Sequence, residues 1–288
     1  MGRLEEMAHG ATLGDIGAPT PRAVAFFSRF VRPLVAALFR PTLEGVEHLP
    51  PSGPFLLVAN HSAGLAIAEI LSFSALYLER VGPARRLAGF AHPAGFQAWP
   101  TKQFHRELGS IPSTYEAALD ALARGVPVLV FPGGDHESLR PLWQANRVDF
   151  GGRVGFLRIA QRAGVPIVPM GIRGSHFTVP ILWRSRALAT LLVLPRLLWR
   201  GKRWALSLLG LLGSVAIALT PLPLIAQAAL IFLWLGTPLT MLPIIPAPIR
   251  MRIGRPLAVG ELFEGEDPAL QTALARVEAA VQALVAPP

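Results

Sequence analysis

Residues 204–249 form a run of 46 residues without Asp, Glu, Lys, Arg or His, and this run limits most strongly what the chain can fold into. A charge-free stretch of this length is not typical of the surface of a soluble domain. Pro221 and Pro223 divide the run into residues 205–219 and 224–236, each shorter than the roughly 20 residues of a membrane-spanning helix. The pattern predicts a helical hairpin that dips into one leaflet of a membrane. Two tilted spans, or an insertion buried against the domain or a partner chain, are the alternatives.

Basic residues flank this run on both sides, and the whole chain carries a net charge of +9. By the positive-inside tendency, both ends of the hairpin belong on the cytoplasmic side, so we expect the protein at the cytoplasmic face of the inner (cell) membrane, against anionic lipids. A nucleic acid would also attract a basic chain, but Lys102 and Lys202 are its only lysines and no recognised binding module is present, so we expect no nucleic-acid partner. The flanking basic residues are Arg196, Arg200, Lys202, Arg203, Arg250, Arg252 and Arg255.

The chain has no cysteine, which excludes disulfides, thiolate nucleophiles and cysteine-ligated metal sites. Residues 1–20 lack the apolar core of a secretory signal and predict a mobile N-terminal arm. Residues 21–40 alternate apolar side chains with Arg22, Arg29, Arg32 and Arg40, as in a basic amphipathic helix. This helix either lies on a membrane surface or packs on the domain with its arginines in solvent, and one helix can do both.

Short apolar strand patterns alternate with helical patterns through the rest of the chain. Strands are predicted at residues 43–46, 55–59, 86–91, 126–131, 167–172 and 249–253, and helices at 66–78, 113–124, 154–163 and 268–285. This alternation predicts an α/β fold with a mainly parallel, covered sheet. We therefore divide the chain into the arm 1–20, the amphipathic helix 21–40, a core 41–180, the hairpin region 181–249 and a closing strand and helix 250–288.

Two loops that follow buried strands carry residues suited to chemistry. His61 stands where the predicted strand 55–59 ends, and a neutral imidazole can take a proton from a hydroxyl group. The second loop contains Gly133 and Gly134, whose backbone N–H groups could face an oxyanion or a phosphate. A structural histidine and an ordinary tight turn are the alternative interpretations. No Gly-x-Ser-x-Gly elbow is present, which disfavours a serine hydrolase.

The order of four segments resembles the glycerolipid (lysophospholipid/glycerol-phosphate) acyltransferase superfamily. The segments are Asn60-His61, residues 108–112, residues 130–134 with Glu137, and residues 164–170, and the Pro-Gly-Gly-x-x-Glu motif is similar to the branch that includes acylglycerol acyltransferases. The resemblance implies a glycerol-3-phosphate acyltransferase type of sheet, no bound cofactor or metal, and acyl-CoA or acyl-carrier protein as co-substrate. The substrate-binding residues that it suggests are Asn60, Ser62, Gly64, Gly109, Ile111, Pro132, Gly133, Gly134, Glu137, Arg140, Arg147 and Arg153.

The chain departs from the superfamily at its catalytic pair, a His separated by four residues from an Asp. Ala66 stands where that Asp would be, and the first carboxylate is Glu69, eight positions after His61. Eight residues of continuous helix span about 12 Å, so Glu69 can reach His61 only if residues 62–65 form a loop, which Gly64 favours. We expect Glu69 to be the orienting acid. Glu137, Asp135 or no acid at all are the alternatives.

These patterns lead to one functional hypothesis and one rival. The hypothesis is a membrane-associated O-acyltransferase in which His61 is the general base and the acceptor is a lysophospholipid or an acylglycerol. Arg140, Arg147 and Arg153 would bind phosphate groups of the donor or the acceptor, or are simply solvated surface arginines. The rival, motivated by the missing Asp, is a non-catalytic lipid-binding or scaffolding relative that keeps the fold.

Overall fold

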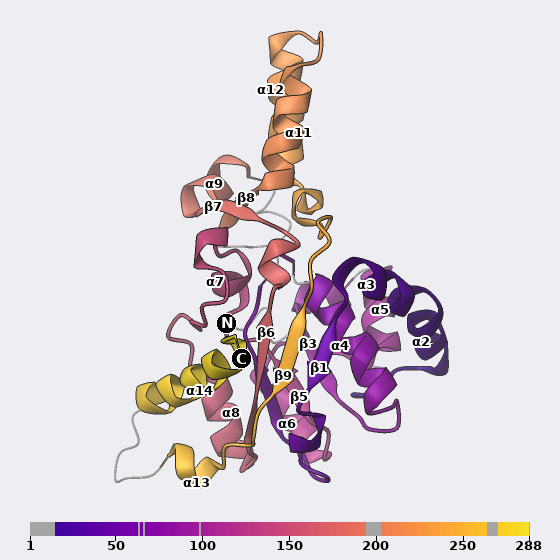
Figure 1. Cartoon of the computed structure of the whole chain (residues 1–288), viewed down its shortest axis with the longest axis vertical. Coiled ribbons are helices and arrows are strands. Elements are labelled where there is room, and N and C mark those ends of the chain that lie inside the picture. The colour runs from indigo at the N-terminus through magenta and orange to yellow at the C-terminus, as the bar shows by residue number, and fades with distance from the viewer. Residues whose placement is uncertain are drawn as a thin grey trace.

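The computed structural model describes residues 15–62, 64–65, 67–97, 99–193, 203–263 and 270–287, and it has an α/β architecture (Figure 1). Its main sheet has seven strands in the order β1-β9-β6-β2-β5-β3-β4. Every neighbouring pair is parallel except β6 with β9. The strands are β1 (Thr42–Glu44), β2 (Leu56–Ala59), β3 (Ala88–Ala91), β4 (Ile111–Pro112), β5 (Val128–Val130), β6 (Ile167–Arg173) and β9 (Arg250–Ile253). The prediction of a mainly parallel sheet is confirmed.

Helices cover both faces of this sheet because successive side chains of its buried strands point to opposite sides. On β2, Leu56 and Val58 belong to one apolar core and Leu57 and Ala59 to the other. The first core includes residues of α6 (Tyr115–Ala123), α8 (Gly155–Ala163) and α14 (Leu270–Val285). The second includes residues of α4 (Ile67–Arg80) and of the N-terminal helix. Shorter elements connect these layers: η2 (Val46–His48), η3 (Pro93–Phe96), α5 (Thr101–Glu107), α7 (Gly134–Ser138), η4 (Leu142–Gln144), η5 (Ser175–Phe177) and α13 (Val259–Leu262).

The N-terminal helix consists of α2 (Pro21–Phe26), the π-helical turn η1 (Phe27–Val31) and α3 (Arg32–Phe39). The Thr20 side chain caps it by accepting the Ala23 N–H. One face is buried in the second core, through Phe27, Val31, Val35 and Phe39. On the other side, Phe26, Phe30 and Leu34 are about half exposed. The helix therefore packs on the domain and still presents an apolar stripe to its surroundings.

Residues 15–20 pack against the core instead of extending from it as a mobile arm. Ile16 is buried, and the Gly17 N–H donates to the Gly109 carbonyl at 2.8 Å. The Leu87 N–H donates in turn to the Gly17 carbonyl at 2.9 Å. The prediction of an arm is wrong for this segment, because Ile16 fills an apolar site of the first core. Residues 1–14 lie outside the described residues.

The region between β6 and β9 holds more than a hairpin. Strands β7 (Ile181–Ser185) and β8 (Trp204–Ser207) form a small antiparallel sheet, with α9 (Arg186–Leu191) between them in sequence. The hairpin helices are α11 (Leu208–Ala218) and α12 (Leu224–Gly236), and η6 (Pro238–Met241) leads back to the main sheet. The sequence predicted that the first hairpin helix begins at residue 205. The helix begins three residues later, at Leu208, because residues 204–207 form β8 and pair with β7. Arg196, Arg200 and Lys202 lie outside the described residues.

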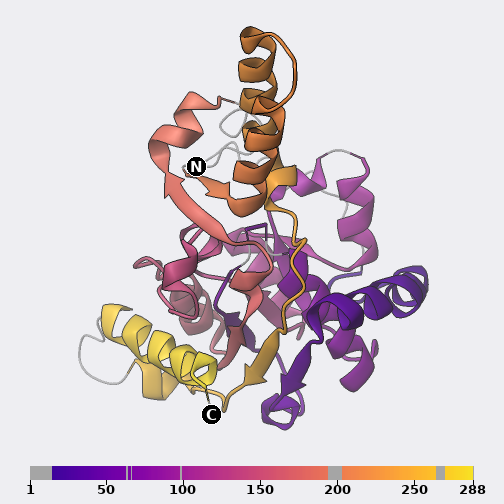
Figure 2. The same ribbon diagram turned by 45° about the horizontal axis from the view of Figure 1, so that its top comes forward.

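The two hairpin helices pack closely against each other and project from the domain (Figures 1 and 2). The Trp234 indole N–H donates to the Gly210 carbonyl at 3.1 Å, and the Trp204 indole N–H donates to the Leu235 carbonyl at 2.7 Å. At the tip, Leu219, Leu224 and Ile225 are about 80% exposed, which is unusual for large apolar side chains. Within the described part of the chain, no helix is long and apolar enough to cross a membrane.

Candidate functional site

The loop after β2 brings His61 and Glu69 together. Residues 62, 64 and 65 are not helical and α4 begins at Ile67, so the condition for Glu69 to reach back is met. The His61 Nδ1 atom lies 2.6 Å from Glu69 Oε1. Gly64 makes the turn with a φ of +63°, which favours glycine, and its N–H donates to the Ser138 carbonyl at 2.8 Å. The loop expected between His61 and Glu69 is thus present at the described residues 62, 64 and 65.

Glu69 is fully buried, and its carboxylate is held by the residue next to His61. The Ser62 N–H donates to Oε1 at 3.1 Å and to Oε2 at 3.2 Å, and the Ser62 hydroxyl donates to Oε2 at 2.8 Å. An ionised carboxylate only accepts hydrogen bonds, so the neutral His61 ring facing it carries its proton on Nδ1 and keeps a free lone pair on Nε2. The Nδ1 contact is close but not aligned as a hydrogen bond, which is common in enzymes before substrate binds.

The diglycine loop lies against the same histidine. Glu137 Oε2 accepts the backbone N–H of His61 at 3.0 Å, and the His61 ring lies 4.5 Å from the Phe131 ring, centroid to centroid. A Cβ atom at Gly133 would lie 2.2 Å from Glu137 Oε2, so only glycine allows this carboxylate to approach the loop. The register of β2 with β5 and β6 explains the meeting, because the parallel strands end at the same edge of the sheet.

The backbone donors of the diglycine loop are not equivalent. The Gly134 N–H donates to the Phe131 carbonyl at 3.1 Å, so the expectation that it faces a substrate is wrong in this structure. Gly133 is the other donor that the sequence suggested for an oxyanion. The Arg153 side chain binds the carbonyl groups of this loop: its Nη1 atom donates to Pro132 O at 3.3 Å and to Gly133 O at 2.7 Å. Arg153 also pairs with Asp135.

The three arginines predicted to bind phosphate differ in what they contact. Arg140 is 1% exposed, lies 3.7 Å from Glu137 Oε1, and donates to the carbonyl groups of Arg147 and Asp149. Its guanidinium is thus enclosed by the protein, and the prediction that it binds a substrate phosphate is wrong because the same groups satisfy it internally. Arg153 braces the diglycine loop, whereas the side chain of Arg147 is exposed.

Several other residues predicted to bind substrate have structural roles. Asn60 is buried and joins β2 to β6, donating to the Ile172 carbonyl at 2.8 Å and accepting the Ile172 N–H at 2.7 Å. Ile111 is fully buried on the edge strand β4, and the carbonyl of Gly109 accepts the Gly17 N–H. Ser62 is also buried, on Glu69. These residues were predicted to bind substrate because they lie near a motif in the sequence. Nearness to a motif does not show whether a side chain is buried.

Two further buried ionisable groups, Glu137 and His176, lie near His61 and have shifted pKa values. Burial raises the pKa of Glu137 to about 7, against the opposing effects of the Asp149 and His61 N–H donors and the Arg140 guanidinium. Burial, with smaller contributions from the nearby charges of Arg140 and His61, lowers the pKa of His176 to about 4, so this imidazole is neutral at physiological pH. His176 is 5% exposed. His61 thus has buried ionisable neighbours, while its own side chain is 16% exposed.

Sequence reasoning missed three residues at this site: Ser175, His176 and Asp149. Ser175 and His176 follow the carboxyl end of β6, which is adjacent to β2. Functional side chains gather at the carboxyl ends of parallel strands, and the predicted strand 167–172 ends just before Ser175 and His176. Its position in the sequence therefore could have indicated both residues. Asp149 contributes its N–H to Glu137 Oε1 at 3.0 Å and its carboxylate to His136 Nε2 at 3.0 Å, and no local pattern marks it.

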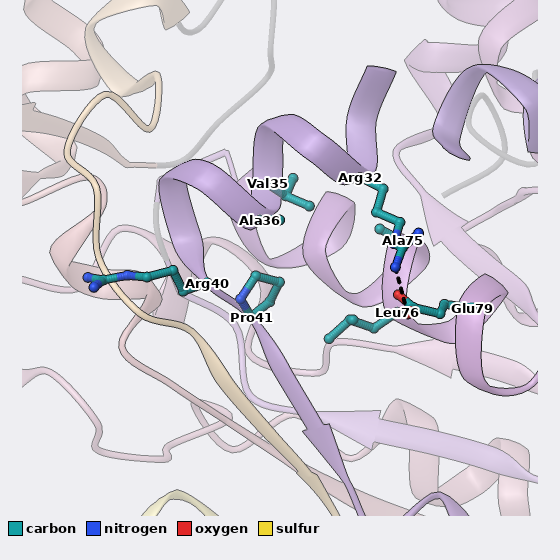
Figure 3. Close-up of a pocket in the computed structure, with 8 residues that line it drawn as sticks. All are labelled: Arg32, Val35, Ala36, Arg40, Pro41, Ala75, Leu76 and Glu79. Carbon is teal, nitrogen blue, oxygen red and sulfur yellow. Dashed lines mark hydrogen bonds and ion pairs between the residues drawn. The ribbon is translucent and has the colours of Figure 1, made fainter. Parts of the chain in front are cut away.

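A separate surface groove lies between α3 and the C-terminal half of α4 (Figure 3). An ion pair of 2.8 Å between Arg32 and Glu79 crosses it. None of the residues predicted for the site contributes to it. Its lining consists of Arg32, Val35, Ala36, Arg40, Pro41, Ala75, Leu76 and Glu79.

The sequence is similar to a known protein family and to several known proteins. Residues 40–173, which include both loops of the site, match the family model named Acyltransferase. An uncharacterized protein of Mycobacterium tuberculosis is 33% identical over 175 residues, which cover 59% of this chain and 48% of that protein. The chloroplastic phytyl ester synthase 2 of Arabidopsis thaliana is 30% identical over 140 residues, which cover 46% of this chain and 19% of that protein. The chain thus matches about half of the mycobacterial relative and a smaller part of the plant one.

A solved structure shares the fold. The crystal structure of the 1-acyl-sn-glycerophosphate (LPA) acyltransferase PlsC from Thermotoga maritima matches with a TM-score of 0.53 and 19% sequence identity, and the match covers 92% of this chain and 80% of that chain. The mostly parallel sheet flanked by helices is therefore a known arrangement, as the resemblance of the sequence motifs implied.

Proposed function

We propose that the chain, whose residues 40–173 match the Acyltransferase family model, is a glycerolipid acyltransferase that transfers a fatty acyl group from a thioester donor to a hydroxyl group of a lipid. The observation that carries the proposal is the 2.6 Å approach of His61 Nδ1 to the buried carboxylate of Glu69, inside the segment that matches the family. A histidine oriented by a carboxylate, with its second nitrogen free, is suited to take a proton from an alcohol.

The reaction is a direct acyl transfer. His61 Nε2 takes the proton of the acceptor hydroxyl while the oxygen attacks the thioester carbonyl, which gives a tetrahedral oxyanion and an imidazolium. Glu69 stabilises the imidazolium, and the Gly133 N–H is the nearby candidate for contact with the oxyanion. Collapse of the intermediate breaks the carbon–sulfur bond, and the imidazolium returns its proton to the leaving sulfur. The products are an ester and a free thiol.

The acceptor that we propose is a lysophospholipid or an acylglycerol, and the donor is acyl-CoA or acyl-carrier protein. Relatives of the chain have names that refer to lipid alcohols, namely a phytyl ester synthase and a 1-acyl-sn-glycerophosphate acyltransferase. The Pro-Gly-Gly-x-x-Glu motif at residues 132–137 favours an acylglycerol-type acceptor. Arg140 is buried, and the exposed Arg153 is engaged by the Gly133 carbonyl and Asp135, so we propose that the exposed Arg147 contacts a donor phosphate.

We also propose that the hairpin α11–α12 and the N-terminal helix bind the cytoplasmic face of a membrane with anionic lipids. Support comes from the absence of charge over residues 204–249, the exposed apolar side chains at the hairpin tip and the stripe of Phe26, Phe30 and Leu34. Helices of 11 and 13 residues would be about 16 and 20 Å long, which matches one leaflet better than the roughly 30 Å core of a bilayer. The hairpin stands at the end of the sheet where the site lies (Figure 1), so a lipid acceptor would have a short path from the membrane to His61.

The proposed activity predicts release of thiol that depends on an acceptor. Purified protein in lipid vesicles, given a long-chain acyl-CoA or acyl-carrier protein, is expected to release free thiol and form an ester when lysophospholipid, monoacylglycerol or diacylglycerol is added, each acceptor tested separately. A thiol reagent follows the first product, and mass spectrometry identifies the second. Protein that is folded and yet releases no thiol with any acceptor would contradict the enzyme and support the non-catalytic lipid-binding relative.

The hairpin proposal predicts a loss of membrane binding when its tip becomes charged. The double substitution Leu224→Asp/Ile225→Asp is expected to lower binding to anionic vesicles at least about 100-fold, because an acidic side chain inside the bilayer costs about 2.5–3.5 kcal/mol. Co-sedimentation with vesicles measures the change. The matched control is Phe104→Asp/Trp143→Asp, which charges two exposed aromatic residues outside the hairpin and should leave binding within threefold of the parent. Equal losses in the two double variants would contradict the assignment.

A further inference from the structure

We propose that Ser175, acting through Ser62, is a positioning residue that holds the carboxylate of Glu69 toward His61. The inference deepens the proposed function, because it assigns to His61 the role of base described above. The three residues Ser62, Glu69 and Ser175 are each 0% exposed. The Ser62 Oγ atom donates to Glu69 Oε2 at 2.8 Å and is in direct contact with the Ser175 Oγ atom. Buried hydrogen bonds therefore run from Ser175 through Ser62 to Glu69, whose Oε1 atom lies 2.6 Å from His61 Nδ1.

The chemistry of these groups fixes the direction of the hydrogen bonds. The Glu69 carboxylate can only accept, and the Ser62 hydroxyl has one hydrogen, which it gives to Glu69. The contact between the two serine oxygens therefore requires the Ser175 hydroxyl to donate to Ser62. In this arrangement Ser62 cannot rotate its hydroxyl without losing two hydrogen bonds, and Glu69 keeps Oε1 turned to His61 Nδ1.

The backbone around Ser175 fixes its position. Gly174 has a φ of +94°, and a Cβ atom there would lie 2.1 Å from the Pro248 carbonyl, so only glycine allows this turn after β6. The carbonyl of Ser175 accepts the Thr178 hydroxyl at 2.8 Å. Asn60 joins β2 to β6 through both hydrogen bonds to Ile172, directly before the His61 loop. Neighbouring strands thus deliver Ser62 and Ser175 to one point on rigid supports.

A buried serine can also have a purely structural role, and Ser72 on α4 provides a control for this alternative. Ser72 is 0% exposed, its Oγ atom has no hydrogen-bond partner, and it lies three residues after Glu69 on the same helix. Ser72→Ala removes a buried hydroxyl near Glu69 without touching the chain of hydrogen bonds. A purely structural role of Ser175 would make Ser175→Ala behave like this control.

The first experiment compares the kinetics of Ser62→Ala, Ser175→Ala, their double variant and Ser72→Ala. We expect kcat to fall about 10- to 100-fold in Ser62→Ala and 3- to 10-fold in Ser175→Ala, with KM for the acceptor unchanged in both. In Ser72→Ala, kcat should fall less than twofold. Because Ser175 acts through Ser62, the double variant should be no slower than Ser62→Ala alone. Independent, multiplicative losses in the double variant would overturn the proposal, as would a change in KM without one in kcat.

The second experiment reads the position of the proton on His61 and needs no turnover. Nitrogen NMR of labelled histidine in the full-length protein gives the share of neutral His61 that is protonated at Nδ1. That share should be high in the parent and in Ser72→Ala, and lower in Ser62→Ala and Ser175→Ala. An unchanged share in Ser175→Ala overturns the positioning role even if the protein is an active acyltransferase. A parent protein without activity, in which the share still falls as expected, would instead contradict the proposed function alone.

Discussion

Replacement of His61 by Gln is expected to lower kcat for acyl transfer by about 10³-fold, within the range of 10²–10⁴ that general base catalysis contributes. Glutamine is close to histidine in size and can still donate to Glu69, but it has no lone pair that takes a proton at neutral pH. The KM for the acyl thioester should change less than threefold, because the imidazole is assigned to proton transfer and not to donor binding. Steady-state kinetics with thiol detection gives both parameters.

A second histidine of the same region provides a matched control for this prediction. His136 also pairs with a carboxylate, since its Nε2 atom lies 3.0 Å from Asp149 Oδ2, and its side chain is 18% exposed, compared with 16% for His61. His136→Gln should keep kcat within about tenfold of the parent. If the two variants lose activity equally, or if His61→Gln retains most of its turnover, His61 is not the base.

Replacement of Arg140 by Ala is expected to lower the free energy of unfolding by about 3–5 kcal/mol, because it removes one partner from a buried ionic cluster. The guanidinium is 1% exposed and faces Glu137, which is itself buried and binds the His61 backbone. Without Arg140, the Glu137 carboxylate and the carbonyl groups of Arg147 and Asp149 lose their cationic partner. Denaturant unfolding in detergent, followed by tryptophan fluorescence, measures the loss.

The neighbouring Arg147 is the control for this second prediction. Its side chain is exposed, so Arg147→Ala should change the unfolding free energy by no more than about 0.5 kcal/mol. It is also the arginine that we propose for contact with a donor phosphate, so its variant should raise KM for the thioester while its stability is kept. A stable Arg140→Ala protein with a raised KM would reverse the roles assigned to these two arginines.

The sequence predicted the central strands of the fold because each is a short apolar run bounded by glycine or proline. β2 and β5 lie within the predicted segments, and β6 extends one residue beyond its predicted segment, to Arg173. The strands β7 and β8 were not predicted, since β8 lies at the start of the charge-free run, where apolar residues alone do not separate a buried strand from a helix. β4 has two residues and is too short for any periodicity.

The site was only partly predictable for a related reason. His61 and the diglycine loop lie at strand ends that local patterns reveal, and the loop at Gly64 that brings Glu69 back could be anticipated from a single glycine. Ser62 and Ser175 are 113 positions apart, and their contact exists only because β2 and β6 are neighbours in the sheet. Burial is likewise a property of the folded chain, which is why Arg140 resembled a substrate-binding residue in the sequence.

Gly64 packs closely against the segments on either side of the hairpin. A Cβ atom at this position would lie 3.1 Å from Met241 Cβ and 3.2 Å from Val179 Cγ1. The turn between His61 and Glu69 is therefore closely packed against η6, which follows the hairpin. The loop that joins His61 to Glu69 therefore lies directly beside the residues that precede and follow the hairpin, and a side chain larger than glycine at this position would press on both.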